Sequence, residues 1–167
     1  MDTGLKEKTV LITGASRNIG ALAAISFARE GANLAICTSS KMDRLNDVVK
    51  EARALGVKVV AEQCDVADGA SVNRFVDKTL AELGTVHVAI NNAVDRGAEG
   101  GFLAVSDEVW ENSFRVNLGG PRNICKAVLP AMIKPKEVVS LMLYLASEDA
   151  GYITGQAYLM NGGLYFH

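Results

Sequence analysis

The segment Thr13-Gly14-Ala15-Ser16-Arg17-Asn18-Ile19-Gly20 joins a short apolar run to an amphipathic stretch and gives the strongest indication of the fold. The preceding residues 9–12 are typical of a buried strand, and residues 18–29 have the periodicity of a helix. The side of that helix richest in apolar groups comprises Ile19, Leu22, Ala23, Ser26 and Phe27. A glycine-containing turn from strand into helix directs free backbone N–H groups and the positive helix end toward one point, which suits a phosphate. The N-terminal half is therefore a candidate dinucleotide site.

Strands and helices are predicted to alternate along the rest of the chain. The pattern indicates strands at 33–37, 57–64 and 86–91, and helices at 43–55 and 70–83, with Gly31, Gly56 and Gly84 ending helices. A long helix capped by Ser106 is expected to run to 132, followed by a helix at 135–146 and a strand at 157–160. This order predicts an α/β fold in one domain over residues 1–167, a doubly wound parallel sheet (Rossmann fold) in three αβα layers.

Composition indicates an ordinary globular protein and argues against several classes of partner. Of 167 residues, 49% are hydrophobic and 22% charged, and the net charge of −2 gives no electrostatic reason to expect nucleic acid or a membrane surface as partner. The charged N-terminus lacks the apolar core of a signal peptide, and the longest apolar run, 138–146, is too short to cross a bilayer. We therefore expect a cytoplasmic protein.

Isolated cysteines and aromatic residues are assigned to the core. Cys37, Cys64 and Cys125 are odd in number and widely spaced, which argues against a disulfide framework or a metal site and favours small buried hydrophobes. Trp110 and Phe114, four residues apart on the long helix, are likewise predicted to be core.

Four candidate ligand groups follow four predicted strands. Gly14, Ser39, Asp65 and Asn92 each fall at or just after the carboxyl end of a strand. Ligands of parallel α/β sheets bind beyond those ends, so the groups are expected to gather at one edge of the sheet.

Together these motifs resemble the classical short-chain dehydrogenase/reductase family, particularly its 3-oxoacyl-[acyl-carrier-protein] reductase-like members. The segment 13–20 is similar to the family's cofactor loop, and Asn91-Asn92-Ala93 to the motif that ends its fourth strand. Asn117 matches the asparagine of the catalytic tetrad, with the implied role of holding a proton-relaying water. Residues 152–156 and 161–163 are similar to the C-terminal signature, so the resemblance covers nearly all of the chain.

Two positions depart from the family pattern. Asn18 stands where the cofactor loop usually has glycine, and because asparagine adopts positive φ more readily than other non-glycine residues, the turn is expected to survive. Val94 stands where the fourth-strand motif normally ends in glycine, which predicts a narrower floor near the nicotinamide.

The resemblance implies a cofactor site, and the residues favour NADP(H) over NAD(H). An NAD-preferring site places a carboxylate after the second strand to accept from the ribose 2′-OH, whereas this chain has Thr38-Ser39-Ser40-Lys41, with Arg17 expected on the 2′-phosphate. Asp65 has two open interpretations, an adenine contact or a turn cap. The implied cofactor-binding residues are Gly14, Ser16, Arg17, Asn18, Ile19, Gly20, Ser39, Asp65, Val66, Asn92 and Ala93.

The family's proton donor has no counterpart in this sequence. The family uses a tyrosine with a lysine four residues later and an upstream serine, but none of Tyr144, Tyr152, Tyr158 and Tyr165 has a lysine at that spacing. Two βα units that carry this chemistry are missing between residues 133 and 134. Either the protein contains this segment and the sequence omits it, or the protein lacks it. We favour omission, because deletion would expose a buried strand edge and uncover apolar helix faces.

The resulting interpretation is an NADPH-dependent oxidoreductase that reduces a 3-oxoacyl thioester or another small ketone to an alcohol, with Asn117 as its one assigned catalytic residue. A homotetramer is expected from the family. One alternative is a truncated, catalytically inactive nucleotide-binding protein. Another is a methyltransferase using S-adenosylmethionine, although that class usually has an acid after the second strand and Thr38-Ser39-Ser40 offers none.

Overall fold

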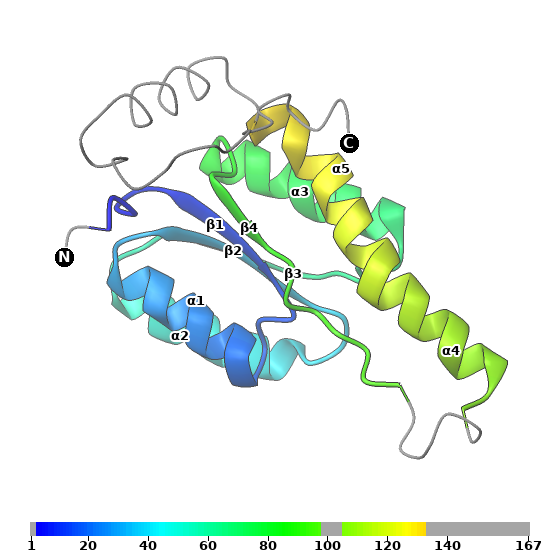
Figure 1. Ribbon diagram of the computed structural model, residues 1–167. Coiled ribbons are helices and arrows are strands. Elements are labelled where there is room, and N and C mark those ends of the chain that lie inside the picture. Colours follow the sequence, from blue (N-terminus) through cyan, green and yellow to red (C-terminus); the bar gives the residue numbers. More distant parts are fainter. Residues whose placement is uncertain (1–2, 98–104, 133–167) are drawn as a thin grey trace, which may run out of the picture. The chain divides into compact units, whose positions relative to one another are not determined.

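The computed structural model describes residues 3–97 and 105–132, and it confirms the predicted alternation over this range (Figure 1). Residues 1–128 form one compact unit, and residues 129–167 form a second, of which only the end of the last described helix is visible. The predicted helix at 135–146 and strand at 157–160 lie outside the described residues. The elements, in order, are β1 (Thr9–Thr13), α1 (Asn18–Arg29), β2 (Asn33–Thr38), α2 (Met42–Ala54), β3 (Val59–Gln63), α3 (Gly69–Leu83), β4 (Val88–Ile90), α4 (Asp107–Phe114), η2 (Arg115–Gly119) and α5 (Gly120–Met132).

The four strands form a parallel sheet in the order β3-β2-β1-β4. In the register, Val10 of β1 pairs with Leu34 of β2 and with Val88 of β4. Helices α1 and α2 cover one face, and α3 and the first part of α5 cover the other (Figure 1). This arrangement confirms the predicted doubly wound α/β architecture and brings the carboxyl ends of all four strands to one edge.

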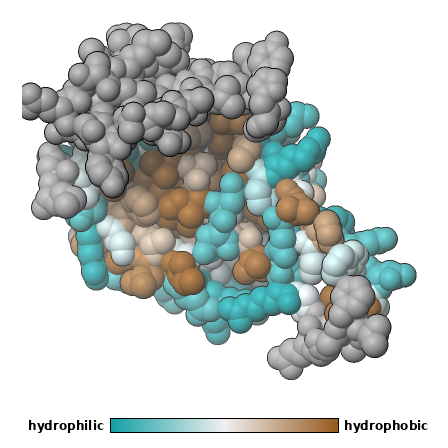
Figure 2. Space-filling view, in the orientation of Figure 1, coloured by the Kyte–Doolittle hydropathy of each residue, from teal (hydrophilic) through white to brown (hydrophobic). Residues whose placement is uncertain are grey.

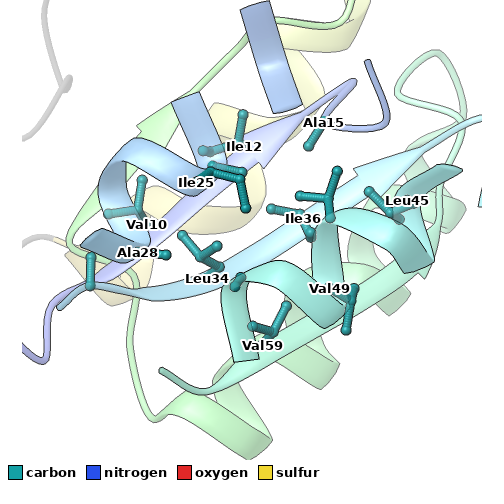
Figure 3. Close-up of a cluster of buried hydrophobic side chains, with 14 residues drawn as sticks. Val10, Ile12, Ala15, Ile25, Ala28, Leu34, Ile36, Leu45, Val49 and Val59 are labelled. Carbon is teal, nitrogen blue, oxygen red and sulfur yellow. The ribbon is translucent and has the colours of Figure 1, made fainter. Parts of the chain in front are cut away.

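The core between the sheet and helices α1 and α2 consists of aliphatic side chains (Figure 3). Helix α1 contributes Gly20, Ala24, Ile25 and Ala28, all buried. Three of these residues are small and let the helix axis lie close to the strands. They therefore keep the distance between helix and sheet short next to the Gly14–Gly20 turn.

The prediction of which side of α1 faces the core is wrong for Ile19 and Leu22. Ile19 is 77% exposed and Leu22 67% exposed, whereas Ala23 and Phe27 pack partly against the core and Ser26 is exposed. The phase of the helix is set by Gly20, which must face the turn at Gly14. At about 100° per residue, Ile19 and Leu22 are then directed away from the sheet.

The prediction that Trp110 and Phe114 are core residues is also wrong. Their side chains are 49% and 47% exposed, with ring centroids 5.1 Å apart, and α4 has no buried residue. Helix α4 extends beyond the carboxyl ends of the strands (Figure 1), so the two rings contact each other instead of the sheet. Apolar side chains also reach the surface elsewhere, as the face in Figure 2 shows.

The predicted burial of the cysteines is confirmed for two of the three. Cys37 and Cys64 are buried, Cys125 is partly buried, and all three are free thiols. In the described ranges 3–97 and 105–132, no helix combines the length and apolar character needed to cross a membrane. Nor do His, Cys, Asp and Glu side chains of these ranges gather in a group suited to a metal ion.

Candidate functional site

A cleft of about 410 Å³ opens at the carboxyl ends of the four strands. The sheet order arranges its lining in sequence: Asp65 after β3, Ser39 after β2, the Gly14–Gly20 turn after β1, and the loop that begins at Asn92 after β4. All the residues predicted to bind cofactor line this cleft: Gly14, Ser16, Arg17, Asn18, Ile19, Gly20, Ser39, Asp65, Val66, Asn92 and Ala93. The structure therefore brings them together, and their contacts with a cofactor stay a prediction.

The turn between β1 and α1 has no room for side chains at its two glycines. Gly14 has φ of 66°, and a Cβ there would lie 2.9 Å from the Cα of Ala93. A Cβ at Gly20 would lie 2.6 Å from Nδ2 of Asn92 and would also strike the carbonyl oxygen of Gly14. Asn18 adopts φ of 49°, which confirms that asparagine sustains the turn in place of glycine.

The start of α1 offers backbone N–H groups to the cleft. Arg17 precedes the helix and forms no side-chain cap, and the first turn contains no acidic residue. The positive end of the helix dipole therefore points into the cleft without a competing carboxylate on the helix itself, as an anion site requires.

Thr13 and Asn92 connect the end of β4 to this turn. The Thr13 hydroxyl oxygen accepts hydrogen bonds from the backbone N–H groups of Asn92 and Ala93, both at 3.0 Å. The Asn92 amide in turn donates to the carbonyl oxygens of Thr13, at 2.9 Å, and Gly14, at 3.1 Å. The sequence predicted Asn92 but missed Thr13, whose buried hydroxyl serves two donors.

The cleft at the end of β2 is rich in hydroxyl and cationic groups. Thr38, Ser39, Ser40 and Lys41 all line it, and the Thr38 hydroxyl lies 3.1 Å from that of Ser16 in a buried pair. Among the described residues, neither Arg17 nor Lys41 forms an ion pair. Two cations without an ion pair among the described residues therefore line this cleft.

A pair of thiols lies behind the hydroxyl-rich end. Cys64 lines the cleft after β3, and its thiol is hydrogen-bonded with that of Cys37. This bond lowers the pKa of Cys64 and raises the pKa of Cys37.

Asp65 caps a turn, the second of its two predicted roles. Its Oδ1 accepts from the backbone N–H of Ala67 at 2.9 Å, while the residue also lines the cleft. The next residue, Val66, is held by α5: Asn123 donates to its carbonyl oxygen at 3.0 Å, and a Cβ at Gly120 would lie 2.8 Å from its Cγ2. Helix α5 thus fixes the loop where an adenine ring is expected.

Asn123→Ala is expected to weaken binding of adenosine 2′,5′-bisphosphate about fivefold, because the Val66 carbonyl loses its partner and the loop gains freedom; a net hydrogen bond contributes about 1 kcal/mol. Isothermal titration calorimetry measures this change. Arg122→Ala, at an exposed neighbouring position without an ion pair, is the matched control and should bind like the wild type. Equal affinities for all three proteins would contradict the role of Asn123.

Asn117 holds the loop after β4 and does not line the cleft. Its Oδ1 accepts from the backbone N–H of Asp95 at 2.9 Å, and its Nδ2 donates to the carbonyl oxygen of Asp95 at 2.8 Å. It lies in the π-helical turn η2, and its predicted role in proton relay stays a prediction. Val94, which departs from the family pattern, lies in the cleft wall and is 63% exposed.

The Asp95 side chain adds contacts that sequence reasoning missed. Its Oδ1 accepts from the backbone N–H of Gly97 at 3.1 Å, and its Oδ2 accepts from Asn112 Nδ2 at 2.8 Å and the Ser113 hydroxyl at 3.1 Å. The Gly97 N–H and the Asn112 amide hold the pKa of the Asp95 carboxyl below its usual value. An aspartate two residues before a glycine is typical of such a turn, so the local bond had a signal in the sequence.

Comparisons with known proteins agree on one family. Residues 8–152 match the family model described as short chain dehydrogenase. The chain is 33% identical over 157 residues to the short chain dehydrogenase/reductase dpmpG of Macrophomina phaseolina, covering 92% of this chain and 89% of the relative. It is also 33% identical over 129 residues to the 3-oxoacyl-[acyl-carrier-protein] reductase FabG of Staphylococcus epidermidis, covering 77% of this chain and 52% of that protein.

Solved structures with the same fold contain both kinds of nicotinamide cofactor. NAD+-bound xylitol dehydrogenase is similar with a TM-score of 0.73 and 27% identity, covering 77% of this chain and 49% of that one. A metagenomic short-chain oxidoreductase in complex with NADP is similar with a TM-score of 0.72 and 28% identity, covering 78% of this chain and 58% of that one. The chain therefore spans about half the length of FabG and of these two structures.

Proposed function

The chain belongs to the short-chain dehydrogenase/reductase family, and from this premise we propose that it binds NADP(H) and serves the NADPH-dependent reduction of a ketone. The residues present fit this cofactor. The turn at Gly14 and Gly20 leaves a cradle that a Cβ would fill, and the start of α1 directs backbone N–H groups into it. When bound, NADPH supplies a hydride, while the described residues bind its phosphates and orient it along the sheet edge.

The observation that carries the choice of NADP(H) is the polarity of the cleft at the end of β2. Ser39 occupies a position where a carboxylate would accept from a ribose 2′-OH, and Arg17 and Lys41 line the same cleft without ion pairs. Cations and hydroxyls suit a phosphate, and a carboxylate would repel one. The similar solved structures include complexes of both cofactors, so the preference depends on these side chains.

Ser39→Asp is expected to weaken NADPH binding about 30-fold and to leave NADH binding equal or tighter, because the new carboxylate faces the 2′-phosphate; hydrogen bonds to charged groups contribute about 1.5–3 kcal/mol. Fluorescence titration of NADPH and NADH with each variant measures both affinities. Arg44→Ala, an exposed cation of α2 outside the cleft, is the control and should change neither. A wild-type preference for NADH would overturn the assignment of NADP(H).

The proposed substrate is a 3-oxoacyl thioester or another small ketone, supported by the likeness to FabG. Oxidation of NADPH that depends on an added 3-oxoacyl thioester tests this.

We further propose that the protein forms a homotetramer, in keeping with the exposed side chains of Trp110, Phe114 and Leu118. We also propose a cytoplasmic location, in keeping with the three free thiols. Light scattering of the purified protein tests the assembly.

A truncated, inactive nucleotide-binding protein is the second candidate. Its support is the absence of a tyrosine–lysine pair from this sequence and the similar extent of dpmpG, of which the chain covers 89%. NADPH binding without ketone-dependent oxidation, by a protein whose intact mass is 17.7 kDa, would favour it over the reductase. A larger mass would indicate a polypeptide that contains the catalytic segment between residues 133 and 134.

A further inference from the structure

Beyond Asn92 and Ala93, the loop residues after β4 have no assigned role in holding the cofactor. The sheet order β3-β2-β1-β4 places the hydroxyl-rich pocket at one end of the cleft, the phosphate turn in the middle and the loop Val94–Gly97 at the other end. A dinucleotide with its adenosine at β2 and β3 and its phosphates at the turn must extend its nicotinamide half toward this loop. This step rests on the proposed function.

We infer that Asp95 is a positioning residue for the nicotinamide half of the cofactor, because its carboxylate fixes the loop after β4 to helix α4. Val94 and Arg96, its neighbours on either side, both line the cleft, as does its partner Asn112. Whatever fixes Asp95 therefore fixes the cleft wall on both sides of it.

The loop is held at two levels. Asn117 of η2 binds the backbone N–H and carbonyl of Asp95, which sets the path of the main chain. Asn112 and Ser113 lie one helical turn before Asn117 and donate hydrogen bonds to the Asp95 carboxylate. They therefore fix how the loop is rotated about its backbone bonds to Asn117. The Gly97 N–H closes the turn on the other carboxylate oxygen, so both oxygens are engaged.

A carboxylate suits this position better than any uncharged side chain. All three groups that face it are donors: a backbone N–H, an amide NH2 and a hydroxyl. Hydrogen bonds to an ionised acceptor are roughly twice as strong as neutral ones. Arg96 forms no ion pair among the described residues, so the neighbouring guanidinium does not draw the carboxylate away.

The contact serves the site more than the core. Helix α4 has no buried residue, and Asn112 is exposed, so loss of these bonds removes little packing. An exposed hydrogen-bonded carboxylate contributes modestly to folding stability. The expected effect of breaking it is a less ordered loop, and hence weaker binding of the half of the ligand that reaches the loop.

The test compares NADPH with adenosine 2′,5′-bisphosphate, which carries the adenosine end and lacks the nicotinamide half. Asp95→Asn places an amide against the donors of Asn112 and Ser113, and Asn112→Asp places a carboxylate against Asp95. Each is expected to weaken NADPH binding about tenfold, or 1.4 kcal/mol, and to leave bisphosphate binding within about twofold. The double variant exchanges donor and acceptor and should recover NADPH affinity to within about threefold.

Glu111→Gln is the matched control, because it removes an exposed carboxylate of α4 that does not line the cleft, and it should bind both ligands like the wild type. Equal losses of both ligands in Asp95→Asn, or an unchanged NADPH affinity, would overturn the positioning role. Failure of the double variant to recover would overturn the pairing with Asn112. A wild type that binds neither ligand would overturn the proposed function and this inference with it, a result distinct from the other two.

Discussion

Gly20→Ala is expected to weaken NADPH binding at least 100-fold, equivalent to ~3 kcal/mol, the largest expected effect on ligand binding. The added methyl group would lie 2.6 Å from the Asn92 amide and would strike the Gly14 carbonyl, so α1 must move away from the turn. Overpacking of this kind costs ~1–3 kcal/mol of folding stability, and it also displaces the N–H groups that we propose bind phosphate. Fluorescence titration measures the affinity, and urea unfolding measures the stability.

The sign of the change in folding stability distinguishes overpacking, which destabilises the protein, from helix propensity, which would stabilise it. Alanine in place of glycine within a helix would by itself stabilise it by about 1 kcal/mol. Gly69→Ala, at the first residue of α3, is the matched control because the nearest atom to its Cβ is 4.0 Å away, and it should be neutral or stabilising. A Gly20→Ala protein as stable as the wild type, with unchanged NADPH affinity, would refute the close approach of helix and turn.

Thr13→Val is expected to lower the free energy of unfolding by ~1–3 kcal/mol. The substitution keeps the shape of the buried side chain but leaves the backbone N–H of Ala93 without its acceptor, while the N–H of Asn92 keeps only its second acceptor, the Ile90 carbonyl oxygen at 3.1 Å. An unsatisfied buried donor costs ~1–3 kcal/mol, and one is created here. Urea denaturation followed by circular dichroism measures the change.

Thr13→Ser provides the control, because it retains the hydroxyl and removes only a methyl group. It should lose about 1 kcal/mol, the transfer free energy of that methyl group. If Thr13→Val were as stable as the wild type while Thr13→Ser was destabilised, the packing of the methyl group, rather than the hydrogen bonds of the hydroxyl, would stabilise this junction.

Much of the fold was predictable because its signals are local in sequence. Strand and helix periods, with Gly31, Gly56 and Gly84 at helix ends, located the elements within a few residues. The edge of the sheet where the cleft lies followed from the parallel order, and every residue predicted for the cofactor lines this cleft. The positive φ of Asn18 followed from a property of asparagine alone.

The wrong predictions concern which side of a helix is buried, and that depends on tertiary contacts. The period of α1 could not reveal that Gly20 approaches Gly14, and this contact decides that Ile19 and Leu22 face outward. Trp110 and Phe114 have the spacing of core residues, but α4 extends past the strands that would have covered them.

Long-range polar contacts were equally beyond sequence reasoning. Thr13 bonds to residues nearly 80 positions later, and the link from Asp95 to Asn112 depends on where α4 lies. The π-helical form of η2 has no periodic signal either, since its five residues continue the surrounding helix. Only the Asp95–Gly97 turn had a local signature.

The continuous rod from α4 through η2 to α5 has a consequence for synthesis on the ribosome. All four strands of the described sheet have been made once residue 90 is joined, yet the loops that border the cleft are anchored by Asn117 and Asn123, which come later. Domains begin to fold while the chain is still growing, so the nascent sheet precedes its finished ligand cleft. A nucleotide bound as we propose can therefore stabilise the emerging chain fully only after residue 123 has left the exit tunnel.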